Sequence, residues 1–245
     1  MQKLITLLKK TGCLTNLIIK PWQWLLTLYR PWQIKIYLKS HPVRKMQIGT
    51  GTGLNAMAGW LNTDLIPRTT KLVFLDASKR FPIDDCTLDY IFSEAMIAAI
   101  EYSAAVNMLR ECFRTLKPGG RIRIATIDLV FFINLYNKKE KTELQKQFIR
   151  HSMKAHVGMP DIHQHEEVFI MNLFFRAWNN KFIYDYEVLR DTVAQVGFIN
   201  VTRHQRRESN DKNLQGLEAH DINYGKIRFP DELGIGLIVE AQKPE

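Results

Sequence analysis

Acidic residues are missing from the first part of this 245-residue chain. Met1–Lys45 contains nine Lys or Arg and no Asp or Glu, although the whole chain has 34 basic and 25 acidic residues. The formal net charge of +9 is therefore that of the N-terminal segment, and everything after Lys45 is electrically balanced. A balanced main part argues against a nucleic-acid-binding domain, which would carry its own basic face.

Cysteine and long apolar runs are also scarce. The three cysteines form no CxxC pair, which argues against a disulfide framework or a structural zinc site and indicates a reducing cytoplasm. No stretch reaches the ~18–20 uninterrupted apolar residues that a membrane-spanning helix needs. The short apolar run 4–8 is followed by lysines without a small-residue cleavage site, so we expect no secretory signal.

The chain divides into two parts at about Lys45. Residues 1–45 form a basic extension with three of the five tryptophans, and residues 46–245 form the main domain. In the main domain, short apolar runs alternate with amphipathic stretches, which indicates βαβ units and a mainly parallel sheet. We predict strands at 46–48, 61–65, 72–75, 88–92, 121–127, from 201 and at 236–241, and helices at 106–116 and 185–196. Residues 117–120 (Lys-Pro-Gly-Gly) should stop the first helix, and 138–167 should be helix and loop outside the core.

A glycine-rich stretch follows the first predicted strand. In Gly49-Thr50-Gly51-Thr52-Gly53, glycine permits a tight turn and close approach of a ligand to the backbone amides. Such free N–H groups favour a carboxylate or a phosphate. Leu54 stands where the dinucleotide fingerprint GxGxxG has its last glycine, so the pattern is GxGxG.

Two carboxylates end the next two predicted strands. Asp64 is placed to accept hydrogen bonds from ribose hydroxyls, and Asp76 is placed to meet an adenine amino group. Neighbouring parallel strands end at one edge of the sheet, where open α/β sheets bind ligands. The alternative is that Asp64 and Asp76 are helix caps or solvated loop residues.

Taken in order, the motifs resemble the class I S-adenosylmethionine (SAM)-dependent methyltransferases, most closely the methyltransferase type 11 group. They are 47–51 (Gln-Ile-Gly-Thr-Gly), 59–64 (Gly-Trp-Leu-Asn-Thr-Asp), 75–78 (Leu-Asp-Ala-Ser), 81–85 (Phe-Pro-Ile-Asp-Asp), 88–94 (Leu-Asp-Tyr-Ile-Phe-Ser-Glu), 111–120 (Glu-Cys-Phe-Arg-Thr-Leu-Lys-Pro-Gly-Gly) and 121–126. The resemblance implies a Rossmann-like, seven-stranded, mainly parallel sheet with helices on both faces and an antiparallel last hairpin. It also implies SAM as cofactor and methyl transfer by direct displacement.

The resemblance assigns roles to particular residues. The cofactor would be held by Gly49, Thr50, Gly51, Gly53, Asp64, Asp76, Ala77 and Ser93. The candidates for acid–base chemistry are Glu94, Asp128 and His220, with His156, His163 and His165 as further candidates. His163 and His165 are spaced for a shared metal, but no cysteine or second cluster completes a site, so we expect none.

Three departures from the family pattern bear on function. Gln47 replaces the usual acidic residue of the first strand, and the helix before Asp64 must be very short. After Glu94, Ala95, Ala98 and Ala99 supply no polar group. The leading hypothesis is methyl transfer to a small-molecule, sugar or lipid-linked acceptor. The alternatives are a catalytically impaired SAM-binding or partner-binding relative and, third, a nicotinamide-dependent oxidoreductase.

The basic extension suggests a location. Its nine cations are interleaved with tryptophan, leucine and isoleucine, which suits a segment lying at an anionic membrane surface. The alternative is a helix that covers the substrate side of its own domain. We therefore expect a cytoplasmic protein. If the extension lies at a membrane surface, we expect the contact to be peripheral and at the inner face of the membrane.

Overall fold

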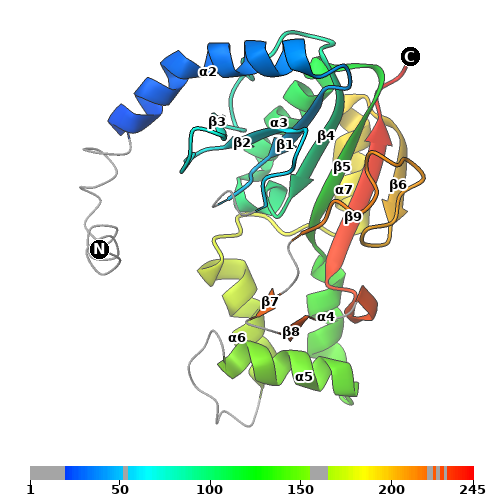
Figure 1. Ribbon diagram of the computed structural model, residues 1–245. Helices are drawn as coiled ribbons and strands as arrows, with labels where there is room; N and C mark the ends of the chain where they lie inside the picture. The colour runs from blue at the N-terminus through cyan, green and yellow to red at the C-terminus, as the bar shows by residue number, and fades with distance from the viewer. Residues whose placement is uncertain (1–19, 52–54, 155–164, 220–222, 225–226, 229–230) are drawn as a thin grey trace.

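The computed structural model describes residues 20–51, 55–154, 165–219, 223–224, 227–228 and 231–245. A seven-stranded sheet in the order β3-β2-β1-β4-β5-β9-β6 forms its centre (Figure 1). The strands β1 (Lys45–Ile48), β2 (Leu61–Asp64), β3 (Val73–Phe74), β4 (Leu88–Glu94) and β5 (Leu116–Ile127) are parallel. β9 (Gly236–Gln242) lies antiparallel between β5 and β6 (Ile199–His204). The predicted class I methyltransferase fold, with its antiparallel last strand, is confirmed.

The fifth strand begins earlier than predicted. Helix α3 (Tyr102–Thr115) is followed directly by β5, which begins at Leu116. Leu116 pairs with Leu88 of β4, and the carbonyl of Gly120 accepts a hydrogen bond from Lys243 N–H. The prediction that the helix stops before residues 117–120 is confirmed, whereas the prediction that the strand begins at residue 121 is wrong, because long-range pairing on both sides extends the strand across 117–120.

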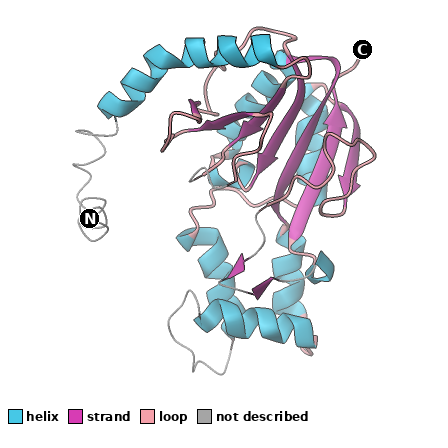
Figure 2. Cartoon of the chain, in the orientation of Figure 1, coloured by secondary structure: helices cyan, strands magenta, loops and turns pink. Residues whose placement is uncertain are grey.

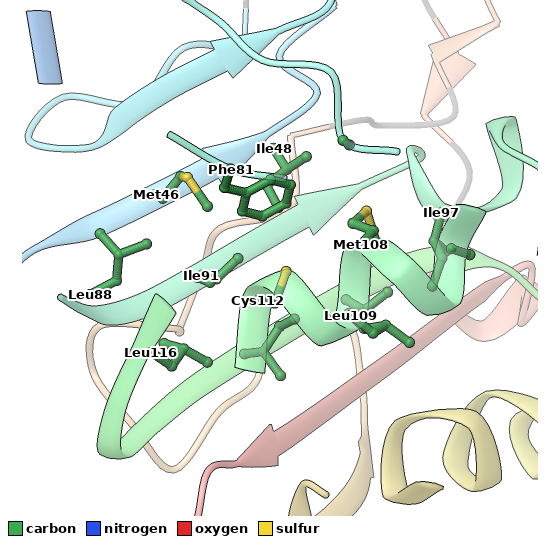
Figure 3. Close-up of a cluster of buried hydrophobic side chains, with 14 of the residues drawn as sticks. Met46, Ile48, Phe81, Leu88, Ile91, Ile97, Met108, Leu109, Cys112 and Leu116 are labelled. Carbon is green, nitrogen blue, oxygen red and sulfur yellow. The ribbon is translucent and has the colours of Figure 1, made fainter. Parts of the chain in front are cut away.

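Helices α3 and α7 (Tyr186–Val196) pack on one face of the sheet. Met108, Leu109 and Cys112 of α3 are fully buried against Met46 and Ile91 of the strands (Figure 3). Burying side chains of this size contributes roughly 1.5–3 kcal/mol each. The predicted boundaries of α7 are confirmed as well: the side chain of Asp185 caps its first turn and Gly197, at φ +116°, ends it.

The opposite face carries a smaller cluster and a buried ion network. Trp60, Phe92 and Leu214 are buried together there. The fully buried guanidinium of Arg123 donates to Glu218 and Glu240, each at 2.5 Å. Arg123 also donates to the carbonyl of residue 208, so the network fastens the segment 205–219 onto the sheet.

Helix α2 (Lys20–Ser40) lies along the β3 edge of the sheet (Figure 1). Ile34 and Tyr37 belong to the main core, and the Tyr37 hydroxyl donates to the carbonyl of Lys45 at 2.7 Å. The C-terminal half of the predicted extension is therefore packed on the main domain. Among the described residues, none of the helices has the length and apolar character needed to cross a membrane.

A helical group lies beyond the carboxyl ends of the parallel strands (Figure 2). It contains α4 (Leu129–Asn137), α5 (Glu143–Ser152), α6 (Glu166–Asn172) and the π-helical turn η4 (Leu173–Ala177). The short strands β7 (Asn223–Tyr224) and β8 (Ile227–Arg228) pair with each other. Two further single turns are η2 (Ile97–Ala99) and η5 (Asp231–Leu233).

The helical group has its own apolar core. Phe131, Phe132, Phe148 and Phe174 are buried in it. The expectation that 138–167 stays outside the core is wrong for α5, which buries Phe148 and Ile149. The polar residues that suggested a surface segment are the outer side of this amphipathic helix.

Candidate functional site

A glycine turn follows β1 at the carboxyl edge of the sheet. Gly49 and Gly51 adopt φ values of +79° and +61°, which side-chain-bearing residues rarely adopt. The N–H groups of Gly49 and Thr50 donate to the carbonyl of Thr63 in β2. The turn is thereby fixed to the neighbouring strand as far as Gly51. Residues 52–54, which include the predicted Gly53, lie outside the described residues.

Asp64 is joined to this turn directly. Its Oδ2 accepts a hydrogen bond from Gly51 N–H at 2.7 Å, and its Oδ1 accepts one from Ile66 N–H at 2.8 Å. A carboxylate has about four acceptor positions, so each oxygen retains a lone pair for a ligand hydroxyl. The two predicted elements of the cofactor site, the glycine turn and this carboxylate, lie in contact.

Asp76 is engaged mainly with its own turn. Its Oδ1 accepts from the N–H and the hydroxyl of Ser78, at 3.0 and 2.6 Å. Its Oδ2 lies 3.8 Å from the ammonium group of Lys79. Ala77, which follows it, is buried. The described contacts of Asp76 are thus those of a loop residue, whereas Asp64 reaches across to the glycine turn.

Four buried oxygens at the ends of three strands have no hydrogen-bond partner in the described structure: Gln47 Oε1, Thr50 Oγ1, Ser93 Oγ and Thr126 Oγ1. In the β1–β4 register Gln47 pairs with Phe92 and Ile48 pairs with Ser93, so the side chains of Gln47 and Ser93 lie on opposite faces of the sheet. An unsatisfied buried polar group costs roughly 1–3 kcal/mol, so each of these oxygens is a candidate contact for a ligand or an ordered water. Thr126 was missed at the sequence level, because nothing in a strand pattern marks one threonine as unpartnered.

The two described candidates for a catalytic carboxylate differ in what holds them. Glu94 ends β4, is buried, and accepts a hydrogen bond from Ala219 N–H at 3.0 Å. Asp128 uses one oxygen to cap α4 through Val130 N–H and the other to pair with Arg203 at 2.7 Å. Both oxygens of Asp128 are therefore used in contacts that hold α4 and β6, and the assignment of either carboxylate as a base stays a prediction.

The three alanines after Glu94 belong to a packed turn. Ala95 has φ +54°, Ala98 is buried, and its carbonyl accepts hydrogen bonds from the N–H groups of residues 181 and 182. The turn directs Met96 onto Gly49, where an added Cβ would lie 2.8 Å from the Met96 Cγ. Sequence reasoning missed Met96, because its contact depends on the strand order rather than on any local motif.

Among the four predicted histidines, His165 alone lies within the described residues. His165 is exposed at the N-cap of α6, whereas His156, His163 and His220 lie outside the described residues. Among the residues with a described position, no group of three or more His, Cys, Asp or Glu is arranged to hold a metal ion.

Two of the family-like motifs meet in a salt-bridge cluster away from the glycine turn. Arg114 donates to Glu111 and Asp85 and to the carbonyls of Phe81 and Ile83. Burial would raise the pKa of Glu111, but the hydrogen bonds from Arg114 and from the Phe81 N–H outweigh it and lower the pKa. These motifs therefore hold the 81–85 loop against α3.

Comparison with known proteins returned no matching family model and no curated relative. Solved structures with similar folds include a SAM-dependent methyltransferase from Archaeoglobus fulgidus, at 15% identity and a TM-score of 0.48, covering 90% of this chain and 93% of that one. Another, from Thermotoga maritima, has 15% identity and a TM-score of 0.45, covering 94% and 97%. The Haemonchus contortus phosphoethanolamine N-methyltransferase 2 in complex with SAM has 12% identity and a TM-score of 0.45, covering 88% and 53%. All three are methyltransferases. At these identities the likeness concerns the fold alone.

Proposed function

We propose that the protein is a SAM-dependent methyltransferase that acts on a small-molecule, sugar or lipid-linked acceptor. The observation that carries the proposal is the joining of the positive-φ glycine turn to Asp64 at 2.7 Å, beside buried oxygens that lack partners. These groups have the chemistry that SAM requires. Unpartnered oxygens suit its ammonium group, and Asp64 suits its ribose hydroxyls, whereas the N–H groups of Gly49, Thr50 and Gly51 already donate within the protein.

When bound, SAM supplies a methyl group on a positively charged sulfur. The residues of this chain would hold that group in line with an acceptor, which can contribute up to ~7–11 kcal/mol of the barrier in favourable cases. Glu94 lies at the end of the strand next to β1, so its buried carboxylate is placed to take a proton from an acceptor oxygen or nitrogen. Asp128 keeps α4 in position through its cap and ion pair.

The first test is binding. Isothermal titration of the full-length protein with SAM and with its demethylated product should give saturable binding, and Asp64→Ala should weaken it about 10- to 150-fold. This range follows from the ~1.5–3 kcal/mol of a hydrogen bond to a charged group. Glu140→Ala, which removes an exposed loop carboxylate, is the matched control and should bind as wild type does.

The outcomes separate the functional classes. Binding of NADH in place of SAM would favour the oxidoreductase, and no binding of either would overturn the proposal. Binding of SAM without turnover would favour the impaired relative, which the alanines at 95, 98 and 99 also suit. In that case Ala95→His and Ala99→His, singly and together, ask whether a polar group restores activity against a panel of acceptors.

A further inference from the structure

Helix α2 is apolar on more than one side. On its inner side, Leu26, Ile34 and Tyr37 are buried against the domain. The amide groups of Gln23 and Gln33 donate to the carbonyls of residues 65 and 70, which fixes the rotation of the helix about its axis. A helix with apolar residues all round is normally buried all round. The outer side of α2 therefore needs explanation.

The outer side exposes large apolar residues in a continuous row. Trp24, Leu28, Trp32 and Ile36 follow one another at intervals of four, which places them along one line of the helix. Trp24 is 63% exposed, Leu28 61% and Trp32 55%. Leu25 lies beside them and is also exposed. A contiguous apolar surface of this kind marks an interaction site rather than ordinary surface scatter.

Positive charge continues the same row. Lys35 and Lys39 follow Trp32 by three and seven residues and therefore lie on the same side, where both are exposed. Arg30 faces inward instead, because its guanidinium donates to the Phe74 carbonyl and lies 5.7 Å from the Phe74 ring centroid. No acidic residue occurs anywhere in residues 1–45.

We propose that the outer face of α2 (Trp24, Leu25, Leu28, Trp32, Lys35, Ile36 and Lys39) docks on the surface of an anionic lipid bilayer. Tryptophan and leucine beside lysine form the mixture that lies at the boundary between headgroups and acyl chains. The aliphatic stem of lysine can remain in the apolar layer while its ammonium group reaches lipid phosphates. The complete lack of acidic residues is the charge pattern that an anionic surface attracts. This proposal is independent of the chemistry at the glycine turn.

The experiment is flotation of the full-length protein with vesicles. One set contains phosphatidylcholine alone and the other contains phosphatidylcholine mixed with phosphatidylglycerol, each at low and at high salt. Wild type should float with the anionic vesicles at low salt and be released by high salt. Lys35→Gln together with Lys39→Gln should lower the partition coefficient about 25-fold, at about fivefold for each charge.

The apolar part is tested by Leu28→Glu together with Trp32→Glu, which should lower partitioning at least ~10-fold. The matched control is Ile133→Glu with Tyr136→Glu, an exposed apolar pair on α4, and it should partition as wild type does. Both pairs are exposed, so melting temperature and SAM titration should stay unchanged and distinguish a failed docking face from a failed fold. Equal partitioning to neutral vesicles, or full partitioning by the α2 variant, would overturn the proposal.

Discussion

Arg123 offers the sharpest test of what holds the sheet and the site together. Its side chain is fully buried and lies between Glu218 and Glu240, whose carboxylates are almost fully buried too. Arg123→Met removes the cation and leaves two carboxylates without it. Breaking a buried ion pair by removing one partner costs about 3–5 kcal/mol, because the remaining charge stays buried.

The loss should be visible in both stability and site geometry. For a chain of this size, about 3–5 kcal/mol corresponds to a fall in melting temperature of roughly 6–20 °C. The network also holds the 205–219 segment, which carries the Ala219 N–H that donates to Glu94. We therefore expect amide hydrogen exchange of residues 205–219 to rise in Arg123→Met before global unfolding.

The matched control replaces all three charges at once. Arg123→Met with Glu218→Gln and Glu240→Gln leaves no buried charge unpaired, so it should recover a large part of the lost stability. Urea unfolding of wild type, the single variant and the triple variant supplies the comparison. A loss below ~1 kcal/mol in the single variant, or no recovery in the triple variant, would refute the reasoning.

Two further outcomes follow from the structure. In the folded chain, the hydrogen bonds that Glu111 accepts from Arg114 and the Phe81 N–H outweigh burial and lower the pKa of Glu111. The contribution of Glu111 to the free energy of unfolding is therefore present above its ordinary pKa of 4.5 and is lost as pH falls through the lower folded value. Arg114→Met should flatten that part of the curve of unfolding free energy against pH. Gly49→Ala should destabilise the fold more than Gly51→Ala, because both positions have positive φ but only the Cβ added at Gly49 meets Met96. Adding Met96→Ala should restore part of the difference in urea unfolding, and equal losses at the two glycines would contradict this.

The strands and the glycine turn could be predicted because their signals are local. Apolar runs that end in glycine or aspartate indicate parallel strands, and the junction of Gly51 with Asp64 follows from the ends of adjacent strands. Local pattern was therefore sufficient for the fold and for one half of the candidate cofactor site.

The remaining site contacts depend on distant residues. Arg123 pairs with carboxylates 95 and 117 residues away, and an arginine between isoleucines indicates only that one side of a strand is polar. Asp128 pairs with Arg203, 75 residues away, a contact that no local motif around Asp128 indicates. Such partners become identifiable only when the sheet brings separate segments together.

The helical group that follows β5 leaves and rejoins the sheet domain at one place. Asp128 and Tyr184 form a parallel bridge, and the N–H of Leu129 donates to the Tyr184 carbonyl at 2.9 Å. Because entry and exit are adjacent, the path of β5 into β9 does not depend on the length of the segment between Asp128 and Tyr184. We therefore expect a shorter or longer connection within this segment to alter what lies over the strand ends while the β5–β9 pairing stays in register.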